Sequence, residues 1–115
     1  MGWRLQKDEG EWKKTAEILD TSVVIEKEVG ATTIFTVVEY PKCLEYVTEV
    51  IYPDENDFKR AIELSRKLYQ IGKPLGAIDI LIASICINKN LKLITKDSGF
   101  NNIKHIEENF DLRII

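Results

Sequence analysis

Short apolar runs alternate along this chain with longer stretches of helical periodicity. The runs at residues 16–19, 32–36, 47–52, 91–95 and 112–115 are rich in Ile, Leu, Val, Thr and Tyr, as β-strands are. Gly30 and Gly72 stand where two of the intervening helical segments end. Strands that alternate with helices in this way predict a three-layer α/β/α sandwich around a central, mainly parallel sheet.

The helical segments differ in length and in how much of their surface is apolar. Short helices are expected over residues 23–29 and from Pro41, because Pro41 disfavours a continuous helix through Tyr40. Residues 77–87 are nearly all apolar and predict a buried helix, and residues 102–109 predict a last short one. An outer amphipathic helix ends at Gly72, and its apolar face comprises Phe58, Ala61, Ile62, Ser65, Leu68 and Tyr69.

Residues 1–14 differ in composition from the rest of the chain. They are mostly polar, and they predict a tail or an edge element. We therefore divide the chain into an N-terminal extension, residues 1–15, and a single domain, residues 16–115. A chain of 115 residues suits one domain with a core of its own.

Composition restricts the possible partners and the compartment. The formal net charge of −3 excludes nucleic-acid binding by a large basic face, so any such contact must be local. Cys43 and Cys86 form no C-x-x-C pair and suit a reducing compartment. The longest apolar run, residues 80–83, is far too short to cross a bilayer. We expect a soluble cytoplasmic protein with no membrane partner.

Four acidic residues are candidates for a functional site. Asp20 and Asp97 directly follow the first and fourth strands, and Glu39 follows the second strand by three residues. Asp79 lies near the start of the buried helix. Because α/β sheets bind ligands at the carboxyl ends of their strands, all four carboxylates can converge at one rim of the sheet.

Clustered carboxylates call for a compensating charge. Each ionised carboxylate raises the pKa of its neighbours, and burial adds to the penalty. Mg²⁺ and Mn²⁺ prefer carboxylate oxygens and water, whereas one His and two separated Cys cannot build a zinc site. A bound divalent cation can lower the pKa of a coordinated water and stabilise charge on a phosphodiester. Hydrolysis of a nucleic acid is therefore the expected chemistry.

Purely structural roles exist for three of these acids. Asp20 can cap the helix that follows it, Glu39 stands in a Thr-x-x-Glu capping-box pattern with Thr36, and Asp97 suits a turn. Asp79 is harder to explain, because a carboxylate without a partner is costly to bury in a helix as apolar as this one.

Three motifs containing these acids, and a glutamate after a strand, resemble a known family. They are Ile18-Leu19-Asp20-Thr21-Ser22-Val23-Val24-Ile25, Gly76-Ala77-Ile78-Asp79-Ile80-Leu81-Ile82-Ala83, and Leu93-Ile94-Thr95-Lys96-Asp97-Ser98-Gly99-Phe100, with Glu39 between the first and the second. From about residue 16 to its end the chain resembles the PIN domain family, and in particular the small prokaryotic PIN proteins of the VapC toxin type.

The resemblance implies a metal-dependent endoribonuclease that is the toxin of a toxin and antitoxin pair. Asp20, Glu39, Asp79 and Asp97 would then bind Mg²⁺ or Mn²⁺ directly or through water, with Thr21, Ser22 and Thr95 as supporting hydrogen-bonding residues. The implied partners are an RNA substrate, a small antitoxin protein that inserts a segment near the acidic pocket, and a second copy in a homodimer.

The sequence also departs from the family pattern. Gly99 stands where many relatives have a further Asp, and the helices after the first and second strands are shortened. These departures motivate an alternative, a catalytically weakened PIN domain that binds RNA or protein as a scaffold in RNA processing. A receiver-like signalling domain fits poorly, because it needs an acidic pair after the first strand, where Thr21 and Ser22 follow Asp20.

Overall fold

Five parallel strands form the centre of the molecule. The computed structural model describes residues 3–5, 12–14 and 16–115. The sheet has the order β5-β4-β3-β6-β7, and every neighbouring pair in it is parallel. Its strands are β3 (Glu17–Leu19), β4 (Ala31–Thr33), β5 (Glu49–Ile51), β6 (Lys92–Thr95) and β7 (Leu112–Ile114). The predicted parallel sheet is confirmed.

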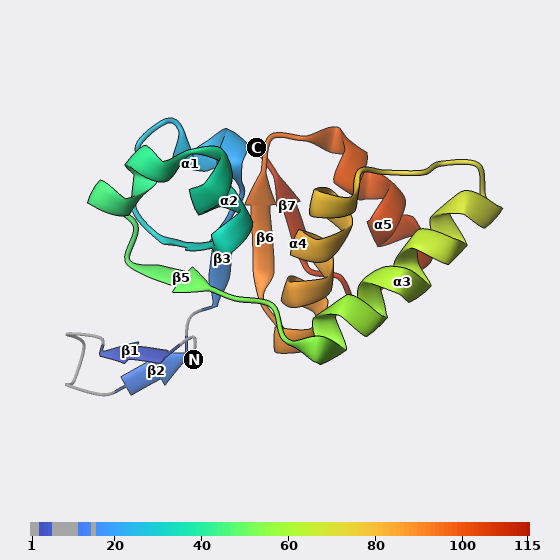
Figure 1. Cartoon of the computed structure of the whole chain (residues 1–115), viewed down its shortest axis with the longest axis horizontal. Helices are drawn as coiled ribbons and strands as arrows, with labels where there is room; N and C mark the ends of the chain where they lie inside the picture. The colour runs from blue at the N-terminus through green and yellow to red at the C-terminus, as the bar shows by residue number, and fades with distance from the viewer. Residues whose placement is uncertain (1–2, 6–11, 15) are drawn as a thin grey trace.

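Helices cover the sheet on both sides (Figure 1). One side carries α1 (Thr21–Val24), α2 (Ile34–Glu39) and the 3-10 helix η2 (Pro41–Glu45). The other carries α3 (Glu55–Gln70), α4 (Ala77–Lys89), the 3-10 helix η3 (Ser98–Phe100) and α5 (Asn101–Ile106). The three-layer architecture and the short helices after the first two strands of this sheet are therefore confirmed.

Alternating residues of the central strands build two separate cores. Ile18 and its strand partner Leu93 pack with α3, α4 and α5 in the larger core. The next pair, Leu19 and Ile94, packs with α1 and η2 in a smaller one. Successive side chains of a strand point to opposite faces, so a sheet covered on both sides needs apolar residues at consecutive positions.

The second predicted strand is wrong beyond Thr33. Thr33 ends β4 and is the N-cap of α2, where its side chain accepts a hydrogen bond from the Thr36 amide. Glu39 is therefore the last residue of a helix and does not follow the strand by three residues. The proposed capping box of Thr36 with Glu39 is wrong for the same reason. The helix predicted at 23–29 is likewise shorter and starts earlier, at Thr21.

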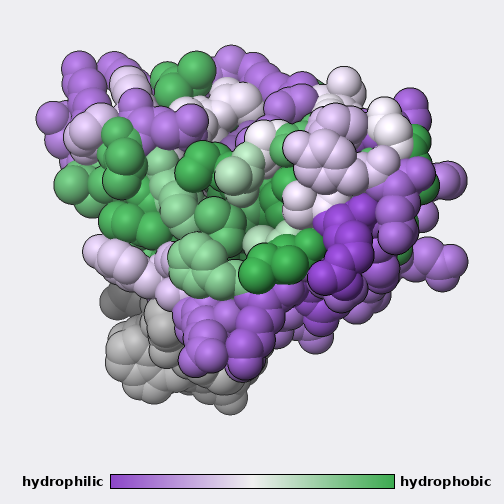
Figure 2. All heavy atoms as spheres, turned by 45° about the vertical axis from the view of Figure 1, so that its right-hand side comes forward, coloured by the Kyte–Doolittle hydropathy of each residue, from purple (hydrophilic) through white to green (hydrophobic). Residues whose placement is uncertain are grey.

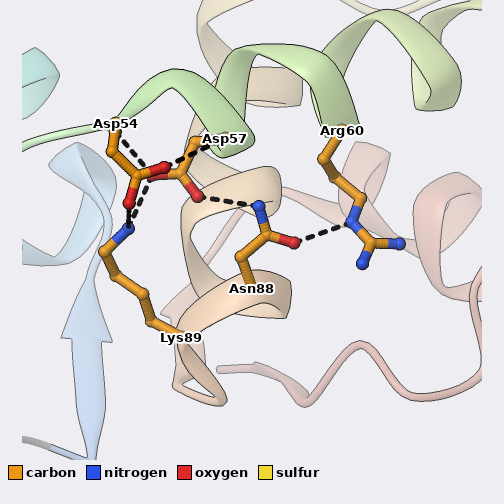
Figure 3. Close-up of polar contacts among 5 residues, drawn as sticks. All are labelled: Asp54, Asp57, Arg60, Asn88 and Lys89. Carbon is orange, nitrogen blue, oxygen red and sulfur yellow. Dashed lines mark hydrogen bonds and ion pairs between the residues drawn. The ribbon is translucent and has the colours of Figure 1, made fainter.

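The predicted apolar face of α3 is only partly buried: Leu68 is buried as expected, whereas three large members of that face are exposed. Phe58, Ile62 and Tyr69 are 48%, 62% and 69% exposed, whereas Asp57, Leu64 and Leu68 are fully buried. The cause lies at the start of the helix, where the Asp57 carboxylate accepts hydrogen bonds from Asn88 (2.9 Å) and Lys89 (2.6 Å) of α4 (Figure 3). This contact sets which face of α3 is buried, because Leu64 and Leu68 lie on the same face as Asp57.

Asp57 also forms a capping box with Asp54. The Asp57 amide donates to the Asp54 side chain (3.1 Å), and the Asp54 amide donates to the Asp57 carboxylate (2.9 Å). Arg60 extends the network through its 2.8 Å hydrogen bond to Asn88 (Figure 3). The network joins the first turn of α3 to the last turn of α4.

Several other predicted elements are present in the structure. The buried helix, the fourth strand and the last strand are confirmed as α4, β6 and β7. Cys43 and Cys86 are buried free thiols. None of the helices in the described part of the chain is long and apolar enough to span a membrane.

The first strands lie outside the parallel sheet. β1 (Trp3–Leu5) and β2 (Trp12–Lys14) pair with each other in an antiparallel, two-stranded sheet of their own. Residues 1–2, 6–11 and 15 lie outside the described part, and the boundary between an extension and a domain at residue 16 stays a prediction.

Candidate metal-binding site

Asp20 follows β3 and is held from two neighbouring elements. It is only 7% exposed, and its Oδ2 accepts hydrogen bonds from the hydroxyls of Thr95 (2.8 Å) and Ser22 (3.4 Å). Burial raises the pKa of the Asp20 carboxyl above its ordinary value, and the charge of Glu39 raises it further, while the Thr95 hydrogen bond opposes the shift. Asp20 is the N-cap residue of α1, but its side chain forms no capping hydrogen bond.

Glu39 reaches the same region from the end of α2. The Thr21 hydroxyl donates a 2.7 Å hydrogen bond to Glu39 Oε1, although the two residues are 18 positions apart in sequence. The Thr21 hydroxyl is also 3.0 Å from the hydroxyl of Thr36. The Thr21 hydroxyl therefore joins Glu39, at the end of a helix, to the turn that follows Asp20.

Thr95 and Ser22 connect Asp20 to the loop after β6. The Asp97 amide donates a 3.0 Å hydrogen bond to the Thr95 hydroxyl, and the Lys96 amide donates one of 3.0 Å to the Ser22 hydroxyl. The Asp97 carboxylate accepts from the Gly99 amide at 2.8 Å and caps η3, so its turn role is real. This role leaves Oδ2 of Asp97 with no hydrogen bond in the described part of the chain.

Asp79 lies in the first turn of α4 and is only partly buried, contrary to the expectation of a carboxylate inside the helix packing. Its pKa is raised to about 6, first by burial and then by the charges of Asp20, Asp97 and Glu39. The three other predicted acids are therefore near enough to Asp79 to influence its carboxyl group electrostatically.

This group of acids has no basic partner in residues 16–115. Among the described residues, no ion pair joins Asp20, Glu39, Asp79 or Asp97 to a Lys, Arg or His. The nearby Lys96 pairs with Glu26 instead. Four carboxylates without a cation suit a hard divalent ion such as Mg²⁺ or Mn²⁺.

The arrangement limits how such an ion would be held. Within residues 16–115, no group of three or more His, Cys, Asp or Glu side chains is placed to hold a metal ion. The four acids therefore do not form one ready-made set of direct ligands, although Mg²⁺ keeps several water molecules and usually takes only one or two carboxylates directly. Among these acids, some would act through water.

Thr36 is a residue of this region that the sequence patterns named only as a possible capping partner of Glu39. It is fully buried in α2, and its hydroxyl contacts that of Thr21. Once α2 is recognised as a helix, Thr36 stands one turn before Glu39, on the same side. The β-branched run of residues 32–36 hid this signal, because it favours a strand.

The chain belongs to the PIN domain family. The family model for the PIN domain matches residues 35–106, more than half of the chain, and this confirms the resemblance drawn from the motifs. A search of curated protein sequences finds no significant match.

Solved structures of the VapC type have the same fold. The chain is 25% identical to a member of the VapBC family of toxin-antitoxin systems, VapBC-5 from Mycobacterium tuberculosis, with a TM-score of 0.69 over 87% of this chain and 97% of that one. It is 20% identical to VapBC2 from Rickettsia felis, bound to a fragment of promoter DNA, with a TM-score of 0.66 over 86% and 98%. VapBC-1 from nontypeable Haemophilus influenzae is 18% identical, with a TM-score of 0.66 over 86% and 97%.

Proposed function

We propose that this protein is a metal-dependent endoribonuclease that hydrolyses RNA phosphodiester bonds in the cytoplasm, as the toxin of a toxin and antitoxin pair. The observation that carries the proposal is Asp79, whose pKa is raised to about 6 by burial and by the charges of the three other predicted acids. Acids that repel one another with no cation between them cost folding stability. Such a cost is typical of sites kept for function.

Each residue of the site has a role in this proposal. Asp20, Glu39, Asp79 and Asp97 hold Mg²⁺ or Mn²⁺ directly or through water, and Thr21, Ser22 and Thr95 orient the carboxylates by hydrogen bonds. A bound divalent ion supplies positive charge that lowers the pKa of water and offsets the charge of the phosphodiester. The three hydroxyls keep the Asp20 and Glu39 carboxylates in place.

A small antitoxin is the expected protein partner. The similar solved structures are VapBC complexes of toxin and antitoxin, and the VapBC-5 protein shares both the fold and 25% of its residues with this chain. An uncontrolled cytoplasmic ribonuclease would damage its host, so a bound inhibitor suits this activity.

We also propose a homodimer, formed through the exposed apolar side of α3. Phe58, Ile62 and Tyr69 project from that helix, and a groove of about 230 Å³ runs between it and α4. Figure 2 shows hydrophobic residues gathered on this side of the molecule between hydrophilic borders. A ridge of this kind can pack against its own copy around a two-fold axis.

A second candidate function is a scaffold that binds RNA or protein without cutting RNA. Two observations favour it: in the described residues no three acidic side chains are placed to hold a metal, and Gly99 replaces a further Asp of many relatives. Such a protein would still bind Mn²⁺ weakly but would leave RNA intact.

Cleavage of a labelled pool of structured RNAs separates the two candidates. The purified protein is incubated with Mn²⁺ or Mg²⁺, with EDTA as one control and the Asp79→Asn variant as the other. The nuclease cuts RNA only with metal, and the variant is inactive. Asn keeps the size of the side chain and removes its charge, so loss of cutting is attributable to the carboxylate.

The opposite result is equally informative. If RNA stays intact with both metals while the wild-type protein still binds Mn²⁺, the nuclease proposal is wrong and the scaffold is favoured. Cutting that survives in Asp79→Asn or in EDTA would place the activity outside this group of acids.

A further inference from the structure

Two threonine hydroxyls and the Glu39 carboxylate form a chain of contacts between α1 and α2. Thr36 Oγ1 is 3.0 Å from Thr21 Oγ1, which in turn is 2.7 Å from Glu39 Oε1. Thr36 is fully buried, Thr21 is half-buried and Glu39 is exposed. The chain of contacts therefore runs from the interior of the protein outward to the acidic rim.

The direction of each hydrogen bond follows from the number of protons that each of the three groups can donate. An ionised carboxylate can only accept, so Thr21 donates its single hydroxyl proton to Glu39. With that proton used, Thr21 can only accept from Thr36, although the distance alone would allow either hydroxyl to donate. Thr36 is therefore the donor at the buried end.

The backbone around Thr36 holds its hydroxyl in place. Its amide donates to the side chain of the N-cap residue Thr33, and its carbonyl accepts from the Tyr40 amide at 2.8 Å. A buried, β-branched side chain in a helix has few rotamers available to it. The hydroxyl of Thr36 is thus a fixed donor aimed at Thr21.

Glu39 needs this support more than Asp20 does. Asp20 is short, buried and held by two hydroxyls, whereas Glu39 is exposed at the end of α2 and accepts one side-chain hydrogen bond, from Thr21. A free glutamate side chain loses substantial rotamer entropy when a ligand fixes it. A carboxylate that is already fixed avoids that loss on binding.

We propose that Thr36 is a positioning residue that fixes the Glu39 carboxylate through the hydroxyl of Thr21, and so prepares it to bind a divalent cation. This inference rests on the proposed metal-binding function. It adds a residue that touches neither metal nor RNA, and it explains why a buried polar side chain stands one turn before the glutamate.

The test compares three variants of the full chain. Thr36→Val keeps the shape of the side chain and removes the hydroxyl, Thr36→Ser keeps the hydroxyl, and Ser84→Ala is the matched control. Ser84 is also fully buried, and its hydroxyl donates to the Ile80 carbonyl at 2.7 Å within α4, with no link to Glu39. Urea unfolding at 25 °C confirms that each variant is folded under the assay conditions, and Thr36→Ala replaces Thr36→Val if valine prevents folding.

Two readouts are taken. In titration with Mn²⁺ alone, Thr36→Val should bind about tenfold more weakly than wild type, the lower end of the effect of removing a residue that supports a ligand. Thr36→Ser and Ser84→Ala should stay within about twofold of wild type, because neither loses that support. In crystals of the metal-free proteins, the contact between Thr21 and Glu39 should be lost in Thr36→Val and kept in Thr36→Ser.

These readouts separate failure of the inference from failure of the proposed function. If Thr36→Val keeps the Thr21 to Glu39 contact and the Mn²⁺ affinity of wild type, Thr36 is not a positioning residue. If wild type neither binds Mn²⁺ nor cuts RNA, the metal-dependent function is wrong, and so is the preparation for a metal. The crystals then still show whether Thr36 orients Glu39.

Discussion

At the scale of single residues, Asp79 is the acid whose ionisation is most disfavoured by the fold. It stands in the first turn of α4, where the helix dipole favours a negative charge, yet its pKa is raised to about 6. Burial and three neighbouring carboxylates therefore outweigh the helix terminus. Asp79 destabilises the metal-free protein and gains most from a bound cation.

The Asp79→Asn variant should be more stable than wild type without metal at pH 7.5. The Asp79 pKa is about 6 in the folded protein and near 3.8 in the unfolded chain, so the folded state loses stability as the pH rises from about 4 to about 6. Because the side chain is partly exposed, we expect only about 1 kcal/mol and a few degrees in melting temperature.

Thermal unfolding at two pH values measures this effect. The gap between variant and wild type should be present at pH 7.5 and should narrow at pH 4, where the wild-type carboxyl is protonated. Added Mn²⁺ should raise the melting temperature of wild type more than that of the variant. Equal melting temperatures at pH 7.5 would contradict the electrostatic account of this site.

Mn²⁺ affinity should fall as the pH is lowered through about 6. A metal displaces protons from its ligands, and the pKa values of Asp79 and Asp20 are both raised. Where one proton is displaced, the affinity falls by about tenfold per pH unit below the pKa. Calorimetric titration from pH 7.5 to pH 5 measures this, and an affinity that does not change with pH would rule out these two carboxyls as ligands.

At the scale of elements, the packing of α3 on α4 depends on one buried ion pair. Asp57 is fully buried and accepts from Lys89 at 2.6 Å, and Lys89 also lies 3.3 Å from Asp54. Lys89 has a raised pKa, because its hydrogen bonds and ion pairs with Asp57 and Asp54 outweigh burial, which is the largest influence and acts in the opposite direction. Both oxygens of the Asp57 carboxylate have hydrogen-bond partners, which are Asn88, Lys89 and the Asp54 amide.

Asp57→Ala should destabilise the protein by about 3 kcal/mol, because it removes a capping box and leaves Lys89 without its closest partner. Glu55→Ala is the matched control in the same turn, since its 3.3 Å pair with Lys59 is exposed and such pairs contribute less than about 1 kcal/mol. Urea denaturation measures both variants. Similar losses in the two would show that the buried pair has no special role.

Whether the sequence could predict an element depends on how far apart in the chain the residues that determine it lie. The strands β3 and β6 and the acids after them were predictable, because a strand and its following turn are set by adjacent residues. The buried face of α3 was predicted only at Leu68, because the orientation of the helix depends on a contact between Asp57 and Lys89, 32 residues away. The end of β4 was missed because Thr33 suits both a strand and an N-cap.

The candidate site shows the same limit. The identity of the four acids followed from their places in the pattern, but their electrostatic coupling and the contact of Thr21 with Glu39 exist only in the folded chain. Thr36 was named only as a possible capping partner of Glu39, because its contact with the Thr21 hydroxyl of another helix exists only in the folded chain.

At the scale of the whole molecule, the exposed apolar side of α3 determines the expected assembly. The double variant Phe58→Glu with Ile62→Glu places charges on two exposed residues of that ridge. It should have the mass of one chain in solution, whereas wild type should have the mass of two. Val29→Glu is the control, because Val29 is exposed and apolar but lies in the turn region after α1. Sedimentation equilibrium measures the mass, and a wild-type mass of one chain would contradict the dimer.

The acidic rim is assembled from segments far apart along the chain. Asp20 receives its shortest hydrogen bond from Thr95, 75 residues later, and β7 pairs with β6 almost at the end of the sequence. A ribosome making this protein therefore releases Asp20 and Glu39 long before the residues that complete their surroundings. If the chain is the nuclease proposed here, a growing chain that lacks Thr95 and Asp97 lacks the support of Asp20 and one of the four acids, so activity must wait until β6 and the loop after it are made.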